Sequence, residues 1–243
     1  MQSWGLTDPG CVRKQNQDAY RMEQLDRGTL LCVVCDGMGG AKSGNIASTL
    51  AVEVFVEEVR RCWIPGMESD KVDQMLRSAV KLANFTVFDQ AAQFEEFSGM
   101  GTTLVAALVR GKKATIVNVG DSRAYGIDRN GIHQITKDHS LVQMMVDRGD
   151  LTPEVAKTYP GKNFITRAIG TETMVLCDIY HWEVSRGDYI LLCSDGLSNV
   201  MDDQEILFEV VHGVNKQHCC KRLLNIAKNR GAPDNVTSVL ILV

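Results

Sequence analysis

The chain has 243 residues, of which 44% are hydrophobic and 23% charged, and its formal net charge is −4. This is the composition of a globular protein with one large domain, and it excludes disordered and collagen-like chains. The negative charge gives no electrostatic argument for nucleic acid, and no apolar run approaches the ~20 residues of a membrane span. The first residues lack the charged and apolar regions of a signal peptide. We therefore expect a cytoplasmic protein that neither binds nucleic acid nor inserts into a membrane.

Groups of strands alternate with groups of helices along the chain. Apolar residues at the spacing of a strand or of a helix define each element. In chain order, we predict a strand at 29–35, a turn at 37–44, helices at 45–61 and 69–94, strands at 102–109, 114–119, 123–127 and 132–136, a helix at 138–149, strands at 178–184 and 189–193, helices at 203–212 and 216–229, and a strand at 236–243. Tight turns at 110–113 and 128–131 make their flanking strands antiparallel. This grouping indicates an α+β fold with helices packed on antiparallel sheets.

The segment in the middle of the chain differs from the rest. Asp138 is placed to cap the helix that follows it. Residues 151–164 are polar, contain Pro153 and Pro160, and show no regular period, as is typical of a surface flap. We expect this flap, about residues 141–164, to be the part of the molecule that selects substrates.

Eight cysteines raise the question of disulfides or a metal site. Cys32, Cys35 and Cys193 lie inside apolar strands, where cysteine acts as a small buried hydrophobe. Cys32 and Cys35 are also three residues apart, so in a strand they face opposite sides of the sheet. This argues against a zinc knuckle or a redox pair, and we expect free thiols.

Four aspartates are the most informative feature of the sequence. Asp36, Asp121, Asp195 and Asp234 each stand beside a glycine or a small polar residue at the end of an apolar run. A carboxylate at the rim of a buried sheet is costly unless it is paired or bound to a cation. Oxygen donors without matching His or Cys favour Mg²⁺ or Mn²⁺ over Zn²⁺. A single Asp-Gly can instead be only a turn, so the prediction of metal depends on the set of four.

A phosphate-binding P-loop is an alternative for the glycine-rich run at 37–44. That motif needs Gly-Lys-Ser in sequence, and here Ala41 separates Gly40 from Lys42. We therefore reject this alternative.

Eight short motifs follow one another along the chain. They are Arg13-Lys-Gln-Asn-Gln-Asp18, Asp36-Gly-Met-Gly-Gly40, Ser98-Gly-Met-Gly-Thr-Thr103, Gly120-Asp-Ser-Arg123, Thr136-Lys-Asp-His-Ser140, Asn163-Phe-Ile-Thr-Arg167, Ser194-Asp-Gly196 and Pro233-Asp-Asn235. In this order they resemble the metal-dependent Ser/Thr protein phosphatases of type 2C, in particular their bacterial single-domain branch. The resemblance implies a four-layer αββα sandwich, with two antiparallel sheets flanked by helices and one catalytic domain over residues 1–243.

The same resemblance implies a binuclear Mn²⁺ or Mg²⁺ centre. Asp36 would bridge two ions, the Gly37 carbonyl would bind the second, and Asp195 and Asp234 would bind the first. Two such ions can share a water molecule and lower its pKa, so that hydroxide attacks phosphorus directly without a covalent intermediate.

Three further residues match family positions. Arg13 resembles the phosphate-binding arginine, whose planar fork can hold two phosphate oxygens, although a surface arginine is the alternative. Asp18 matches an acid that contacts metal-bound water from outside the ligand set, with a structural cap as its alternative. Asp121 matches a residue that holds a third, weaker ion together with Asp195, although a turn-forming aspartate competes with this interpretation.

Two positions depart from the family pattern. Met38 stands where several relatives carry a histidine proposed as the general acid, and methionine cannot donate a proton. Gln17 stands where other members carry glutamate, which removes one negative charge near the second ion. His139, inside the fifth motif, we interpret as structural.

The resemblance also implies the biological class. We expect dephosphorylation of phosphoserine and phosphothreonine proteins in signalling, with a cognate Ser/Thr kinase as a partner, by an enzyme that is a monomer. The alternative is a catalytically weak phosphoprotein-binding module on the same fold. Such a module would be expected to lack some of Asp36, Asp195 and Asp234, and all three are present.

Overall fold

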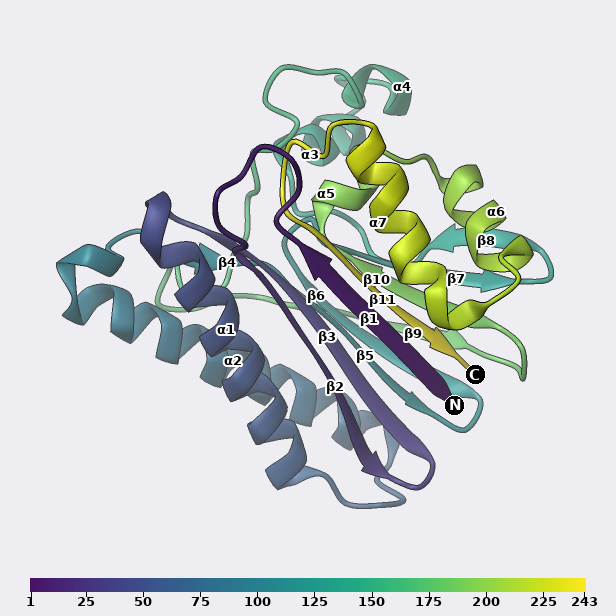
Figure 1. Ribbon diagram of the computed structural model, residues 1–243. Coiled ribbons are helices and arrows are strands. Elements are labelled where there is room, and N and C mark those ends of the chain that lie inside the picture. Colours follow the sequence, from purple (N-terminus) through teal and green to yellow (C-terminus); the bar gives the residue numbers. More distant parts are fainter.

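The computed structural model describes the backbone of all 243 residues and every side chain except those of Ala41 and Lys42. Two antiparallel sheets lie face to face (Figure 1). The first contains, in spatial order, β1 (Gln2–Asp8), β11 (Val236–Leu242), β10 (Tyr189–Cys193), β7 (Arg123–Asp128) and β8 (Gly131–Gln134). The second contains β2 (Asp18–Asp26), β3 (Thr29–Met38), β5 (Leu104–Arg110), β6 (Lys113–Val119) and β9 (Asp178–Glu183), with β4 (Gly101–Thr102) paired to the end of β3.

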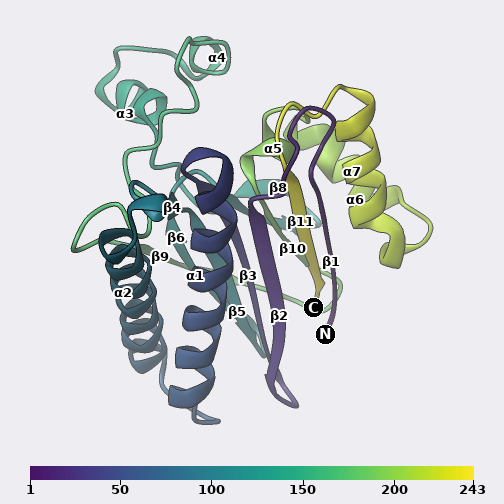
Figure 2. The ribbon, with the colours of Figure 1, turned by 60° about the vertical axis from the view of Figure 1, so that its left-hand side comes forward.

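Helices cover the outer face of each sheet, so that the predicted four-layer αββα sandwich is confirmed (Figure 2). The second sheet is covered by α1 (Gly40–Cys62) and α2 (Ser69–Gln93), and the 3₁₀ turn η1 (Glu95–Phe97) follows them. The first sheet is covered by α5 (Asp195–Ser198), α6 (Asp203–His212), η2 (Lys216–His218) and α7 (Cys219–Asn229). Among the residues that the structure describes, no helix is long and apolar enough to span a bilayer.

Strand β3 shows why its sequence is apolar without interruption. Leu31, Val33 and Cys35 face α1 and α2, whereas the alternate residues Cys32 and Val34 face the other sheet. A strand between two apolar layers has no polar face, so the alternation expected of a half-exposed strand is lost. Cys32 and Cys35 lie on opposite faces, as predicted, and all eight cysteines are free thiols.

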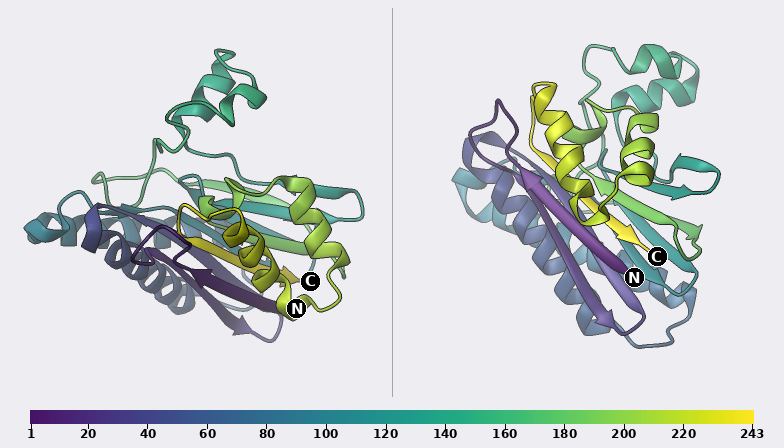
Figure 3. Two further views of the ribbon diagram at one scale, coloured as in Figure 1. Left: turned by 45° about the horizontal axis from the view of Figure 1, so that its top comes forward. Right: turned by 45° about the vertical axis from the view of Figure 1, so that its right-hand side comes forward.

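The flap extends away from the ends of both sheets (Figure 3). It contains α3 (Leu141–Arg148) and α4 (Pro153–Ala156), and neither helix has a buried residue. Its two stems meet at an antiparallel bridge between Ser140 and Ile165.

Three local predictions were wrong or incomplete. Helix α1 begins at Gly40, so the turn predicted over 37–44 is shorter. Asp138 does not cap α3, because Ser140 takes that role and accepts a hydrogen bond from the Gln143 amide, while Asp138 pairs with Arg123. Strands β1 and β2 were not predicted, since their residues are mostly half-buried and lack a continuous apolar run.

Candidate metal centre

The ends of the strands bring the predicted carboxylates to one edge of the sandwich. Asp36 lies near the end of β3, and Asp18, the first residue of β2, stands directly opposite it in the strand register. Asp195 follows the end of β10, and Asp234 comes just before β11, which is antiparallel to β10. Asp121 follows β6. Antiparallel pairing therefore gathers residues that are far apart in sequence.

Backbone contacts fix Asp36 and Gly37 tightly. The Asp36 amide donates to Thr103 Oγ1 at 2.9 Å, and the Asp36 carbonyl accepts from the Thr103 amide at 2.9 Å. The Gly37 amide donates to the Gln17 carbonyl at 3.0 Å, and a Cβ on Gly37 would lie 2.0 Å from the Gly44 carbonyl oxygen. Only glycine fits at position 37.

Two carboxylates present buried oxygen atoms without a hydrogen-bond donor. Asp18 Oδ2 accepts from Ser194 Oγ at 2.7 Å and from Thr237 Oγ1 at 2.6 Å, whereas Asp18 Oδ1 is buried with no partner among the described residues. Asp195 Oδ1 is likewise buried with no hydrogen-bond partner among the described residues. Buried acceptors of this kind are normally satisfied, so these atoms indicate a missing positive or donor group.

Burial and mutual repulsion shift the acidity of the cluster. Burial, with added repulsion from Asp195 and Asp234, raises the pKa of Asp18 to about 7. Burial and repulsion from Asp195 and Asp138 raise the pKa of Asp121 to about 8. The pKa values of Asp36 and Asp195 are raised for the same two reasons, burial being the larger. A divalent cation would relieve both penalties at once.

Two arginines lie close to the carboxylates, and each pairs with a different aspartate. Arg13 Nη2 lies 2.8 Å from Asp234 Oδ2, and its side chain is 53% exposed. Arg123 makes three hydrogen bonds to Asp138, the shortest at 2.7 Å. Arg123 is thus largely occupied by Asp138, and much of the negative charge of Asp121 and Asp36 remains uncompensated.

Asn235 is a site residue whose role the sequence did not reveal. Its Oδ1 accepts from the Gln17 amide at 2.8 Å, and its Nδ2 donates to the carbonyls of Pro9 and Gln15. These three bonds hold the loop that carries Arg13 against the start of β11. The only signal in the sequence was its place next to Asp234 in the last motif.

A cavity of about 680 Å³ opens onto the cluster. Its lining contains Arg13, Gln17, Asp36, Gly37, Met38, Asp121, Asp195 and Asp234. Asp18 is not in the lining and lies buried beside Asp36. A second cavity, of about 900 Å³, shares Asp121, Asn163 and Asp195 with the first and continues under the flap toward α6.

The donor set fits hard divalent cations. In the conformation described, no three Asp, Glu, His or Cys side chains of the described residues form a ready-made metal cluster. In this conformation Asp234 Oδ2 contacts Arg13, and Asp195 Oδ2 accepts from Asn199 Nδ2 at 2.9 Å. The buried oxygens without partners, the raised pKa values and the absence of His and Cys from the lining of this cavity fit Mn²⁺ or Mg²⁺.

The sequence comparisons with known proteins all point to protein phosphatases. The family model "Protein phosphatase 2C" matches residues 12–230. The serine/threonine phosphatase stp of Listeria welshimeri is 32% identical over 235 residues, covering 97% of this chain and 93% of the relative. The protein phosphatase PhpP of Streptococcus pneumoniae is 34% identical over 238 residues, covering 97% and 95%.

Solved structures extend the comparison to the fold. The serine/threonine phosphatase Stp1 from Staphylococcus aureus superposes with a TM-score of 0.93 at 37% identity, covering all of this chain and 94% of that one. The catalytic domain of the phosphatase PstP in complex with two manganese ions gives a TM-score of 0.85 at 33% identity, covering 98% and 96%.

Proposed function

The chain belongs to the protein phosphatase 2C family and is a metal-dependent Ser/Thr protein phosphatase, and we propose that it performs this reaction in the carboxylate pocket, by direct attack of water without a phosphoenzyme. The observation that carries this proposal is the set of buried carboxylate oxygens at the strand ends, two of which lack any partner among the described residues. The alternative, a catalytically weak phosphoprotein-binding module on the same fold, is disfavoured because Asp36, Asp195 and Asp234 are all present.

We assign the metal-binding role to Asp36, the Gly37 carbonyl, Asp195 and Asp234, with Asp121 and Asp195 available to a third ion. When bound, two divalent ions supply positive charge to the phosphate and lower the pKa of a water molecule. We assign Asp18 to the support of the metal ligands from outside the ligand set. Its Oδ2 accepts hydrogen bonds from Ser194 and Thr237, while its Oδ1 is free to accept one more.

Arg13 is assigned to the phosphate. Its guanidinium lines the same cavity as Asp36 and is more than half exposed, so a phosphate oxygen can reach it from solvent. A planar fork can bind two phosphate oxygens, and Nη2 carries two hydrogens, so it can take part in this fork while it still donates to Asp234.

The leaving group needs a proton that Met38 cannot supply. Met38 occupies the cavity wall beside Gly37, and its thioether has no acidic hydrogen. We propose that the leaving alkoxide takes its proton from water in the cavity.

A covalent cysteine route has no support in the structure. Among the described residues no cysteine lines the cavity that contains Asp36. Burial also raises the pKa of Cys193 to about 12 and that of Cys35 well above its usual value, so neither is a ready nucleophile.

An acid quench tests the direct mechanism. The enzyme is mixed with Mn²⁺ and a radiolabelled phosphothreonine peptide, quenched during turnover, and its protein fraction counted. We expect label only in free phosphate. Label that stays on the denatured protein at a stoichiometry near that of the enzyme would replace the direct mechanism with a covalent one.

The remaining expectations extend beyond the site. We propose that phosphoproteins, including a cognate Ser/Thr kinase, are the substrates, and that residues 1–243 act as one cytoplasmic, monomeric catalytic domain. The protein phosphatase activity of the family supports the first part. Sedimentation of the purified protein tests the monomer.

A further inference from the structure

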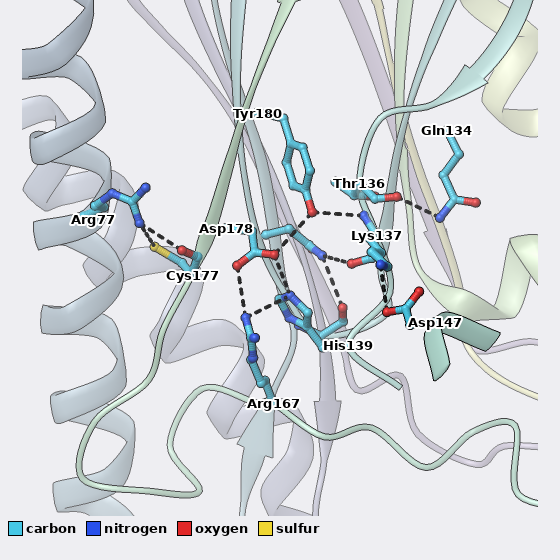
Figure 4. A network of polar contacts seen from close by, with 12 residues as sticks. Arg77, Gln134, Thr136, Lys137, His139, Asp147, Arg167, Cys177, Asp178 and Tyr180 are labelled. Carbon is cyan, nitrogen blue, oxygen red and sulfur yellow. Dashed lines mark hydrogen bonds and ion pairs between the residues drawn. The ribbon is translucent and has the colours of Figure 1, made fainter. Parts of the chain in front are cut away.

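A network of polar contacts lies where the flap joins the sandwich (Figure 4). We call it the flap-base network, and it consists of Asn118, Gly120, Lys137, His139, Arg167, Asp178 and Tyr180. His139 is its centre and is only 7% exposed. It lies two residues before the flap, and the catalytic assignment above gives it no role.

On one side, His139 is bound to the turn that carries Asp121. The Gly120 amide donates to His139 Nδ1 at 3.0 Å, and the His139 amide donates to the Gly120 carbonyl at 2.9 Å. Gly120 has φ +103°, and a Cβ there would lie 2.6 Å from Thr103 Cγ2. His139 therefore binds both polar backbone groups of a residue that cannot be replaced without strain.

On the other side, His139 is bound to strand β9. Its Nε2 lies 3.3 Å from Asp178 Oδ2, and Arg167 Nη1 lies 3.0 Å from Asp178 Oδ1. Tyr180 donates to the same carboxylate at 3.4 Å and accepts from the Lys137 amide at 3.2 Å. Figure 4 shows Asp178 between Arg167, His139 and Tyr180.

The two stems of the flap meet at the same place. The Thr166 amide donates to the His139 carbonyl at 2.7 Å, and the Leu141 amide donates to the Phe164 carbonyl at 2.8 Å. Arg167 belongs to the outgoing stem and His139 to the incoming one, so Asp178 holds both stems at once.

The hydrogen-bond pattern requires one form of the imidazole. Because Nδ1 accepts from the Gly120 amide, the ring proton of a neutral His139 is on Nε2, which lies 3.3 Å from Asp178 Oδ2 and 3.2 Å from Arg167 Nη1, and of these two only the carboxylate can accept it. Burial lowers the pKa of His139 and so favours this neutral form.

We propose that His139 is a positioning residue that joins the flap to the Gly120–Asp121 turn, and that Asp178 and Arg167 hold it there. The flap itself contains no buried residue, so this network rather than a hydrophobic core sets its angle over the second cavity. The link to Asp121 rests on the proposed function. The mechanical part, that the network orders the flap, does not.

Amide hydrogen exchange with the purified protein tests whether the network orders the flap. Three substitutions separate the contact of His139 with Gly120 from its contact with Asp178. His139→Asn keeps an acceptor near the place of Nδ1 but cannot reach Asp178, His139→Gln reaches Asp178 but loses that acceptor, and Asp178→Asn removes the charge that holds both stems. His181→Asn is the matched control, because it removes another His–Asp contact of β9, to Asp73 at 3.1 Å, on the opposite face of the strand from Asp178 and Tyr180.

We expect His139→Asn and Asp178→Asn to speed exchange of the amides over 141–164 by at least about tenfold, and His139→Gln to speed exchange at 120–122. The control should leave both segments unchanged. Asp178 is 40% exposed, so its substitution should not unfold the protein. Wild-type exchange over 141–164 in both His139→Asn and Asp178→Asn would overturn the proposal, as would equal acceleration in the control.

Kinetics supply a second readout. Because most of the flap residues that line a cavity line the second one, and only Asn163 also lines the first, His139→Asn and Asp178→Asn should raise KM for a phosphothreonine peptide more than KM for a small aryl phosphate. Equal effects on both substrates would contradict a role in flap positioning. Should the wild-type protein lack phosphatase activity, the proposed function fails while the exchange result still decides the role of the network.

Discussion

The carboxylate pocket and the flap lie next to each other but are built in different ways. The pocket stands on strand ends whose residues are buried, and its backbone is fixed by the sheets and by contacts such as that of Asp36 with Thr103. The flap has no buried residue and is joined to the sandwich by hydrogen bonds and ion pairs. The proposed chemistry thus stands on rigid elements, while the flap, which we propose selects substrates, can change at little cost to the fold.

Removal of metal should have the largest effect on hydrolysis, because it acts directly on the pocket in which we propose that the reaction takes place. We expect EDTA to abolish hydrolysis of a phosphothreonine peptide and added Mn²⁺ or Mg²⁺ to restore it, since the donors are carboxylate oxygens. Activity is measured as released phosphate. Full activity in chelator, or recovery with Zn²⁺ alone, would contradict the assignment.

Asp36→Asn should have the second-largest effect on hydrolysis. It removes the charge of the residue assigned to both ions, so we expect kcat to fall by at least about 100-fold, or about 2.7 kcal/mol in the barrier. Calorimetric titration with Mn²⁺ should show weaker binding. Asp70→Asn, at the exposed start of α2, is the control and should match the wild type. A variant that keeps more than about a tenth of kcat would remove the bridging role from Asp36.

A pair of truncations compares the stability of the two regions directly. Leu76→Ala, in the fully buried face of α2, should lower the free energy of unfolding by about 2–5 kcal/mol. Val155→Ala, in the flap and 48% exposed, should change it by less than about 0.5 kcal/mol. Urea unfolding measures both. A cost at Val155 close to that at Leu76 would mean that the flap shares the core.

Arg13→Ala should have a smaller effect on catalysis than the loss of a metal ligand. We expect KM for an aryl phosphate to rise about tenfold, or about 1.4 kcal/mol, with a lesser fall in kcat, because the exposed fork mainly positions phosphate. Arg129→Ala in the β7–β8 turn is the control. An unchanged KM would mean that Arg13 is a surface arginine that does not bind phosphate.

The pH dependence of stability should show the smallest effect. The folded state raises the pKa of Asp18 from 3.8 to about 7, so its contribution to stability is fully present below pH 3.8 and is lost as pH rises from there through about 7. In EDTA, Tm should therefore fall between about pH 4 and pH 7, and Asp18→Asn should flatten that slope. Excess Mn²⁺ should weaken the fall. A Tm that rises with pH in the chelated protein, equally in wild type and variant, would contradict the buried charge.

The same contrast shows which features could be predicted from sequence. Strand β3 and the aspartate near its end were readable because an uninterrupted apolar run of this length that ends in Asp-Gly is typical of a buried strand with a polar rim. The opposition of Asp18 and Asp36 was not readable, since it depends on the register of β2, a strand without such a run. The cap of α3 was misassigned because Asp138 finds a stronger partner in Arg123, which is fifteen positions earlier in the chain but adjacent in space. Local signals predict elements, and long-range partners decide how polar residues are used.

The place of β11 between β1 and β10 has a consequence for biosynthesis. Strand β1 pairs with β11 from Gln2 opposite Leu242 to Asp8 opposite Val236, so it pairs with a segment that is made more than two hundred residues after it. Until β11 leaves the ribosome, β1 lacks this neighbour and Asp234 is not beside Asp195. A nascent or truncated chain that ends before β11 therefore has neither the complete first sheet nor the complete pocket. On the proposed function, such a chain should not hydrolyse phosphoproteins until β11 has joined the sheet.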